Sequence, residues 1–595
     1  MKRFNNRLLI FASCAVIAIV VVSCDKSFLN KPTLGTLDPS IIASADGVNG
    51  LLIGAYSLLD GEGAAGDGTG SGASNWIYGG IAADDAYKGS DNSDFNDALA
   101  PETWTTNSAL GILQQKWNVV WAGVQRSNEV LRILPNAKDL TPAQSTEIAA
   151  EAKFLRAFYH MEAKKMWGNI PFIDETVIVG STTPIDNTVD VWPKIEADLT
   201  FAVANLAATQ PQPGRINKWG AMAFQAKAFM FQKKYAAAKP ILASLIANGV
   251  TASGAKYALL PNYASNFNAL QKNSSESVFA AQMSVQDGSS VAWGGDPNGN
   301  FGDILNFPYN GGPGGCCGFY NPSQDLANAY KTDANGLPLL DNWYTGPGVS
   351  TVATPYTGTL DPRIDISIGR PGIPYLDWGP HPGDAWIRNP QADGHFSPKK
   401  NVFPLSQKAS VTDAGSAYWA PTELTANNVN LLRYSDILLW AAECEIQTSG
   451  NAETARGYVN QVRNRVTDPT TWVYKNSDFD ASTFKYKTQT TPADNYKIGL
   501  YPAGAFADPV YALKAIYFER RLELAMEGHR FFDLVRWGIA DQVLNPYSAR
   551  EGVLLNYKAG KTFTKGKNEY YPIPLTELDL INSDKKNKLV QNPGY

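Results

Sequence analysis

Hydrophobic residues recur at helical spacing in two long parts of the chain. From about 34 to 248, and again from 431 to about 545, apolar positions repeat every three or four residues. Between 286 and 430 this periodicity is lost, and the stretch holds 20 Gly and 16 Pro, which break helices and favour turns. The pattern therefore predicts a mostly α-helical protein with an irregular, loop-rich part between two helical parts.

Two segments are predicted to form helical hairpins. The first pairs Trp219–Gln232 with Tyr235–Ala247, and the second pairs Tyr434–Gln447 with Glu453–Arg465. Helices of this length joined by short turns are similar to tetratricopeptide pairs, which bury their apolar faces only by stacking on neighbours. We expect a mostly α fold in which tetratricopeptide-like hairpins support a loop-rich, irregular half. Two unrelated hairpins in an α-rich domain are the alternative.

The N-terminus is predicted to carry an export signal. Three basic residues precede the apolar run Leu8–Val22, and Ser23-Cys24 follows it directly. A run of 15 residues is short for a transmembrane helix, which needs about 20, but it suits the apolar region of a signal peptide. A small residue before a Cys at this point is typical of a bacterial lipoprotein, so residues 1–23 are predicted to be removed and Cys24 to carry the lipid. The alternative is an ordinary signal peptide in which Cys24 is incidental.

Charge and composition exclude some classes of function. The 595 residues include 51 basic and 56 acidic side chains, and loss of residues 1–23 removes three basic ones, which changes the net charge from −5 to −8. A binder that works by neutralising nucleic-acid phosphates is therefore disfavoured. The four histidines never pair at metal-ligand spacing, so we predict neither a metal site nor a cofactor.

The remaining cysteines do not form a disulfide framework. Cys14 leaves with the signal, and Cys444 lies in a helical pattern among apolar residues, where a buried filler is expected. Cys316 and Cys317 are adjacent within a glycine-rich segment. In an exported protein they are candidates for a vicinal disulfide that forms a stiff, apolar knob, and a pair of free thiols is the alternative.

One charged helix suggests catalysis at first sight. Glu519, Glu523 and Glu527 share a helical stripe, and paired carboxylates can act in glycoside hydrolysis. Four arginines between 520 and 536 surround them, however, and arginine neighbours lower carboxylate pKa values, which disfavours a general acid. We predict a structural ion-pair network at this helix, followed by a turn at Gly528.

Asp84-Asp85 and the segment 91–97 form an acidic, oxygen-rich stretch without the EF-hand pattern. A solvated loop is expected there, and a cation or sugar-hydroxyl contact is the alternative.

An ordered set of motifs, from the signal to the last residue, resembles the SusD/RagB family of outer-membrane nutrient-binding lipoproteins of Bacteroidetes. The strongest is the run from Glu519 to Arg530, which continues to Gly538. The others are Asp25–Leu29, Leu155–Tyr159, Trp167–Phe172, Gly214–Lys218, Asp361–Arg363, Lys399-Lys400, Leu432–Glu443, Val459–Arg463, Tyr570–Pro574 and Gln591–Tyr595.

The resemblance implies four tetratricopeptide-like helix pairs and an outer-membrane anchor with the body facing the cell exterior. It also implies a SusC-like TonB-dependent transporter as partner, to which a captured glycan, or sometimes a peptide, is delivered without catalysis. The rival functions are a lipid-anchored glycan hydrolase and a helical-repeat scaffold that binds only protein. The predicted division is a helical region at 24–285, a loop region at 286–430 and a C-terminal region at 431–595, within one body.

Aromatic residues beside Gly or Pro are the candidates for glycan contact, because sugar C–H faces pack on aromatic rings while polar groups bind the hydroxyls. The family's sugar-contacting residues lie outside the matched motifs, so none is transferred from the resemblance. The alternative for each aromatic ring is that it fills a small hydrophobic core beneath the loops. The ligand-binding candidates are Trp76, Tyr78, Asp85, Trp293, Tyr309, Tyr320, Trp343 with its neighbour Tyr344, Trp378 and Trp386.

Overall fold

The computed structural model of the protein describes residues 42–61, 68–177, 185–289, 298–350, 355–413, 424–583 and 588–595. The predicted signal at 1–23, the lipidation site Cys24 and the candidate Trp293 lie outside these residues. Within the described ranges, no helix combines the length and the apolar character that crossing a membrane requires.

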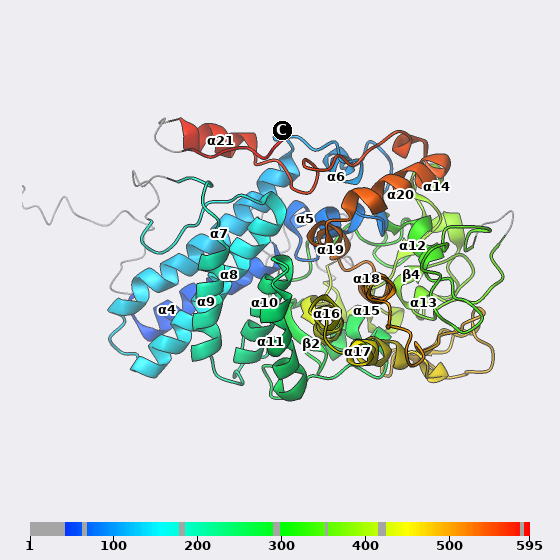
Figure 1. The fold of residues 1–595 in the computed structure, drawn as a ribbon, viewed down its shortest axis with the longest axis horizontal. Coiled ribbons are helices and arrows are strands. Elements are labelled where there is room, and N and C mark those ends of the chain that lie inside the picture. Colours follow the sequence, from blue (N-terminus) through cyan, green and yellow to red (C-terminus); the bar gives the residue numbers. More distant parts are fainter. Residues whose placement is uncertain are drawn as a thin grey trace, which may run out of the picture.

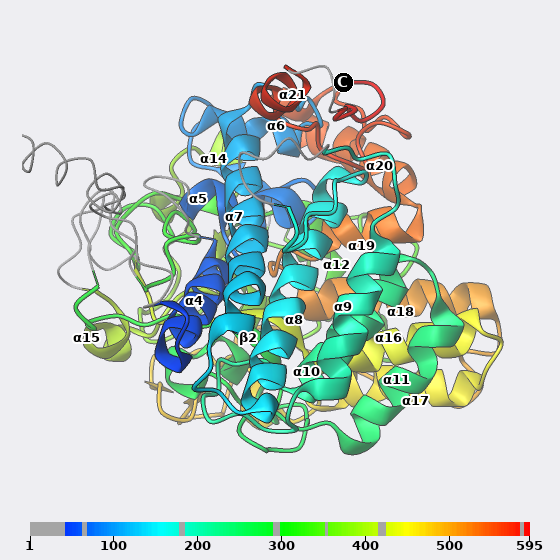
Figure 2. The ribbon, with the colours of Figure 1, turned by 90° about the vertical axis from the view of Figure 1, so that its left-hand side faces the viewer.

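Long helices pack side by side in an array that fills one half of the molecule (Figures 1 and 2). Each contacts the next in chain order, and the array stays continuous from α11 to α16 although the whole loop-rich part of the chain lies between them. The helices of this array are α4 (Ala45–Ser57), α7 (Gly111–Ile133), α8 (Pro142–Trp167), α9 (Trp192–Asn205), α10 (Lys218–Phe231), α11 (Tyr235–Asn248), α16 (Tyr434–Gln447), α17 (Ala452–Asn464) and α18 (Pro509–Leu524).

Both predicted hairpins are confirmed, with boundaries within one residue of those expected. The pairs α10–α11 and α16–α17 pack against each other, and α11 contacts α16. Local signals begin the helices: the Asn217 side chain accepts from the Gly220 N–H at 2.8 Å, and Asn451 caps α17 in the same way. These caps and the helical periodicity are encoded locally, and for this reason the sequence predicts these helices well.

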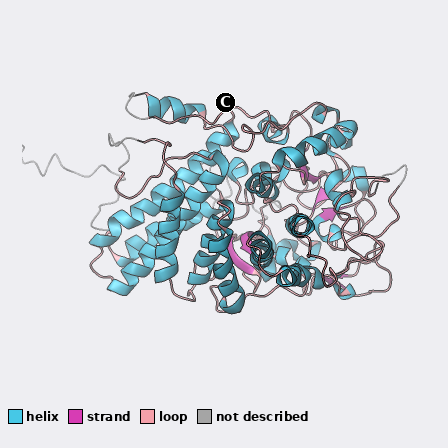
Figure 3. Cartoon of the chain, in the orientation of Figure 1, coloured by secondary structure: helices cyan, strands magenta, loops and turns pink. Residues whose placement is uncertain are grey.

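The other half is irregular, as predicted, and its strands form four small antiparallel sheets of two strands each within the described residues (Figure 3). Two of these sheets join distant parts of the chain: β1 pairs with β3, and β2 with β6. The strands are β1 (Ala86–Gly89), β2 (Ser277–Ala281), β3 (Phe319–Pro322), β4 (Ile368–Gly369), β5 (Ser397–Pro398), β6 (Val429–Arg433), β7 (Phe479–Asp480) and β8 (Lys485–Tyr486). The remaining helices are α5 (Gly68–Ser71), α6 (Leu99–Glu102), α12 (Gln324–Ala329), α13 (Ile364–Ser367), α14 (Pro390–Asp393), α15 (Lys408–Val411), α19 (Arg530–Trp537), α20 (Ala540–Leu554) and α21 (Leu575–Asn582).

A hydrophobic core runs through both halves, from Val48 to Leu589. A second, smaller core lies beneath the loops and includes Phe307, Tyr375 and Phe403. The loop-rich part is thus folded against the helices, and its aromatic side chains fill space there.

The charged helix α18 ends earlier than the sequence suggests. Its last residue is Leu524, so Glu527 lies beyond the helix, and Gly528 adopts a left-handed backbone with φ of +70°. A Cβ at Gly528 would lie 1.8 Å from the Ser74 carbonyl oxygen. The glycine therefore permits both the turn and the close approach of a distant segment.

Candidate functional site

The three glutamates of the charged segment form a buried ion-pair network, as predicted, but with different arginines. Glu519 pairs with Arg363 and Arg463 at 2.6 and 2.7 Å. Glu523 pairs with Arg363 at 3.1 Å and with Arg433 at 3.0 Å, and it also contacts Arg465. The expected partners next to the glutamates in sequence point elsewhere, because the helix places them on other faces.

This network does not supply a catalytic acid. Burial would raise the pKa of Glu523, but Arg465 and Arg433 outweigh it and hold that pKa at about 2. The pKa of Glu527 is likewise about 2, because burial is outweighed by Arg433 and Lys400. Carboxyls that stay ionised and bonded to arginine do not donate protons near neutral pH.

The acidic stretch divides into a buried part and a surface part. The expectation of a solvated loop is wrong for Asp84 and Asp85, which are buried and paired with Arg521 at 3.1 and 3.4 Å. Asp91 and Asp94 lie at the surface, where both contact Arg388. Among the described residues, no cluster of three or more His, Cys, Asp or Glu side chains is arranged to hold a metal ion.

Four aromatic candidates are core residues. Trp76 is 1% exposed and donates from Nε1 to the Gly302 carbonyl at 3.0 Å, and Tyr78 lies with its hydroxyl 2.7 Å from the Gly70 carbonyl oxygen. Tyr320 and Trp386 are buried as well. The prediction that these four rings are displayed to a ligand is therefore wrong. They fill the core, the stated alternative, because segments distant in sequence cover them.

Two candidates near the second core are half-buried. The Trp378 indole donates to the Phe403 carbonyl at 2.8 Å, which ties the ring to the core beneath it. Tyr309 packs under the Arg388 guanidinium, 5.7 Å from ring centroid to Cζ. Neither ring stands free as a platform.

The cysteine sites differ in accessibility. Cys444 is buried as predicted, with its Sγ 3.4 Å from the sulfur of Met230, and burial raises the pKa of its thiol to about 12. The sulfur atoms of Cys316 and Cys317 lie at bonding distance, the arrangement that a vicinal disulfide requires. Cys317 is buried, and Cys316 is only half-buried.

The aromatic pair Trp343-Tyr344 has a different setting, because it borders two open clefts. Tyr344 is 41% exposed, whereas Trp343 is half-buried against Phe518. The larger hollow, here termed the α12–α20 cleft, has a volume of about 480 Å³. Its lining comprises Tyr87, Gln324, Asp325, Asn328, Tyr344, Gly346, Gly348, Pro390, Gly394, His395, Phe396, Arg550, Glu551, Val553, Leu554 and Leu555.

This combination suits a sugar. An exposed phenol ring offers a flat apolar face, while amide, imidazole and guanidinium groups nearby can bond hydroxyls. Gly346 leaves open space beside the ring, since a Cβ there would meet nothing within 4 Å. Figure 1 shows that α12, α14 and α20, which contribute to the cleft, gather at one end of the molecule.

Asp325 organises the wall between the two hollows. Its Oδ1 accepts from the Trp343 indole at 3.1 Å and from Arg521 Nη2 at 3.0 Å, while its Oδ2 accepts from Arg550 Nε at 2.9 Å. The Arg550 guanidinium in turn lies over the Tyr344 ring, with 4.5 Å between Cζ and the ring centroid. One buried carboxylate thus orients the aromatic pair and the arginine before any ligand arrives.

The second carboxyl of the cleft, Glu551, is also committed to the protein. It accepts hydrogen bonds from the Tyr87 hydroxyl and from the Asp325 backbone N–H. Burial, followed by the charge of Asp325, raises its pKa to about 7. Both carboxyls are buried and bonded, whereas a glycosidase needs two that reach the scissile bond.

A second hollow, the α18–α20 cleft, shares Tyr344 and Arg550 with the first and has a volume of about 360 Å³. Its lining comprises Leu340, Asp341, Trp343, Tyr344, Lys514, Tyr517, Phe518, Arg521, Arg530, Ile539, Gln542, Val543, Pro546 and Arg550.

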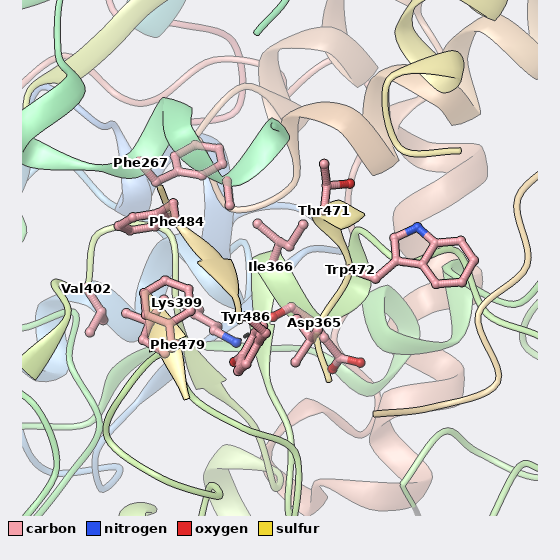
Figure 4. Close-up of a pocket in the computed structure, with 13 residues that line it drawn as sticks. Phe267, Asp365, Ile366, Lys399, Val402, Thr471, Trp472, Phe479, Phe484 and Tyr486 are labelled. Atoms are coloured by element: carbon pink, nitrogen blue, oxygen red, sulfur yellow. Dashed lines mark hydrogen bonds between the residues drawn. The ribbon is translucent and has the colours of Figure 1, made fainter. Parts of the chain in front are cut away.

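A third cavity, beneath the loops, is too small for a sugar. It lies between Phe267, Lys399 and Tyr486 and has a volume of about 30 Å³ (Figure 4). Lys399 is bonded there to the backbone carbonyls of Asp365 and Pro374.

Sequence reasoning found the aromatic pair of the candidate site and missed its polar members. Asp325, Arg550 and Glu551 lie outside the family-like motifs and far apart in the chain. No spacing rule connects 325 with 550, since only the packing of α12 against α20 brings them together.

Comparisons with known proteins agree on one family. A family model described as "SusD family" matches residues 275–595, and one described as "Starch-binding associating with outer membrane" matches residues 79–230. A SusD-like protein of Formosa agariphila is 24% identical over 597 residues, which covers 95% of this chain and 96% of that protein.

Solved structures share the fold. A laminarin-binding SusD-like protein superposes with a TM-score of 0.64 at 22% identity, covering 93% of this chain and 100% of that one. Surface glycan-binding protein A of Bacteroides thetaiotaomicron in complex with laminarihexaose gives a TM-score of 0.61 at 21% identity, covering 92% and 99% of the two chains.

Proposed function

Because this chain belongs to the SusD family, we propose that it is a glycan-binding protein of the bacterial surface whose α12–α20 cleft takes up part of the glycan. The observation that carries the proposal is Tyr344, an exposed ring held beside Arg550 at the edge of a hollow large enough for a sugar residue. Two proteins of the same fold, one that binds laminarin and one solved in complex with laminarihexaose, support a glycan as the ligand class.

Binding without catalysis is the second part of the proposal. The carboxyls of the charged network and of the α12–α20 cleft are bonded to arginines, a tyrosine and backbone, which speaks against the rival glycan hydrolase. The rival scaffold that binds only protein offers no reason for an exposed, oriented aromatic ring above a polar hollow. Purified protein incubated with a bound polysaccharide is expected to release no sugar.

Attachment and delivery complete the proposal. Cys24 carries the lipid that holds the protein at the outer membrane, facing outward, and a SusC-like TonB-dependent transporter receives the glycan. The family description that mentions association with the outer membrane supports this location. Co-purification of such a transporter with tagged protein from detergent-solubilised outer membranes tests the partnership.

The decisive test is affinity electrophoresis and calorimetry with a polysaccharide panel that includes laminarin and starch. Tyr344→Ala should weaken binding of the selected glycan about two- to tenfold, because an aromatic packing contact is worth about 0.5–1.5 kcal/mol and 1.4 kcal/mol is tenfold in affinity. Tyr570→Ala is the matched control, since Tyr570 is 39% exposed and lines neither cleft. Equal losses in both variants would remove the α12–α20 cleft from the proposal, and a panel without any binding would remove glycan binding itself.

A further inference from the structure

The α18–α20 cleft differs from its neighbour in the chemistry of its polar lining. Four cationic side chains face it, Lys514, Arg521, Arg530 and Arg550, against the single carboxylate of Asp341. The α12–α20 cleft instead combines Arg550 with Asp325 and Glu551. Arginine and lysine donate hydrogen bonds and accept none, so the α18–α20 cleft presents mainly donors.

One nitrogen of these side chains, Nη1 of Arg521, is buried and has no hydrogen-bond partner among the described residues. Arg521 donates from Nη2 to the Asp84 carbonyl and to Asp325, and from Nε to Asp85. Its Nη1 is buried and bonds to no residue in the part of the chain that the structure describes. An unsatisfied guanidinium N–H in a buried position is costly unless a ligand or water completes it.

The neighbouring arginine is fixed in a similar manner. Arg530 donates to both Asp84 oxygens, at 2.8 and 3.1 Å, through Nε and Nη2. Arg550 uses the same two nitrogens for Asp325. The carboxylates therefore hold one edge of each guanidinium rigidly, and none of these bonds uses Nη1.

The aromatic pair connects this cleft to the candidate glycan site. Tyr344 and Arg550 line both hollows, and the Arg521 guanidinium lies 5.9 Å from the Trp343 ring centroid. A sugar packed on Tyr344 therefore has a substituent position within reach of the α18–α20 cleft.

We propose that the α18–α20 cleft binds an anionic substituent, a carboxylate or a sulfate group, of the glycan held at Tyr344. The inference rests on the proposed function and adds the ligand class, an acidic glycan. Carboxylate and sulfate oxygens are acceptors that match fixed guanidinium donors, whereas a neutral hydroxyl satisfies them less well.

The charges around the α18–α20 cleft determine how strongly it should prefer an acidic glycan over a neutral one. Asp84, Asp85 and Asp325 lie behind the three arginines and pair with them, so those charges largely cancel. Lys514, at the rim, pairs with Asp341. The ligand therefore gains oriented hydrogen bonds more than long-range attraction, and preference for the acidic form should be about tenfold.

Matched glycan pairs provide the test. Isothermal titration calorimetry is run with oligogalacturonate and alginate oligosaccharides, each beside its carboxyl-reduced form, with sulfated carrageenan oligosaccharide beside its desulfated form, and with neutral laminarin and starch oligosaccharides. At least one acidic member is expected to bind about tenfold more tightly than its neutral counterpart.

Three variants at two positions test whether the preference for acidic glycans arises in the α18–α20 cleft. Lys514→Gln should lower the acidic-to-neutral affinity ratio about threefold, and Arg550→Gln should lower it about tenfold. Arg550→Lys keeps the charge but loses the paired guanidinium donors, so its ratio should lie between those of the wild type and Arg550→Gln. Lys234→Gln is the matched control, because Lys234 is similarly exposed and paired with one carboxylate, Glu196, outside both clefts. The ratio is the readout, since Arg550 also contacts the ring on which neutral sugars would pack.

The outcomes separate the two levels of the proposal. Any of three results would overturn the acidic-glycan assignment and leave glycan binding standing. These are binding of neutral glycans alone, equal affinity within every pair, and an unchanged ratio in both Lys514→Gln and Arg550→Gln. Absence of binding to every member overturns glycan binding itself, and the acidic-glycan assignment with it.

Discussion

Replacing Glu523 with glutamine tests whether the buried ion-pair network stabilises the fold. The side chain is fully buried and receives hydrogen bonds from Arg363 and Arg433 as well as from Arg465. These arginines come from the loop-rich part, the start of α16 and the end of α17. Glutamine keeps the shape and removes only the charge, so that three guanidinium groups lose a counter-ion.

The magnitude follows from the pKa of Glu523. A change from the ordinary 4.5 to about 2 corresponds to about 3 kcal/mol of stability at pH 7, at about 1.4 kcal/mol per pKa unit. Breaking a buried pair by removing one partner costs about 3–5 kcal/mol, which agrees. We therefore expect Glu523→Gln to lower the free energy of unfolding by about 3 kcal/mol at pH 7.

The pH dependence provides a sharper check. Because the folded-state pKa is depressed, the contribution is fully present above the unfolded pKa near 4.5 and is lost as pH falls toward 2. The difference between wild type and variant should shrink to less than half of its pH 7 value at pH 3, about 1 kcal/mol. Urea unfolding followed by far-ultraviolet circular dichroism at pH 7, 5, 4 and 3 measures it.

Glu453→Gln is the matched control. Glu453 also pairs with an arginine, Arg456, but it is solvent-exposed, and its loss should leave the urea midpoint nearly unchanged. A midpoint shift for Glu523→Gln that is no larger than the shift for Glu453→Gln, or that is constant with pH, would refute the reasoning.

Three further predictions concern Gly528, the pair Cys316 and Cys317, and Cys24. Gly528→Ala should destabilise the fold by about 1–3 kcal/mol in urea unfolding, because φ is +70° and a Cβ would collide with the Ser74 carbonyl; an unchanged midpoint would contradict this. Alkylation without reductant should leave Cys316 and Cys317 unmodified in intact-mass measurements, and two alkylated thiols in that peptide would rule out the vicinal disulfide. Cys24→Ala should move the protein out of the outer-membrane fraction, and an unaltered distribution would contradict lipidation there.

The helical hairpins could be predicted from neighbouring residues, whereas the charged network could be predicted only in part. The ends of α10, α11, α16 and α17 follow from apolar spacing, caps and turns within a few residues, so the sequence predicts them to within one residue. The stripe of glutamates predicts ion pairs because ionised carboxylates are rarely buried alone. Their partners were unpredictable, because Arg363 and Arg433 approach Glu523 only after distant segments have packed.

The aromatic candidates show which features follow from the sequence and which depend on the tertiary structure. By itself the sequence determined the helical class, the family and the loop setting of the rings, since these depend on neighbouring residues or on ordered motifs. Tertiary structure alone decided that Trp76 is core while Tyr344 stands exposed beside Arg550. Exposure of a ring depends on which remote segments cover it, and α12, α18 and α20 meet around Tyr344 without covering it.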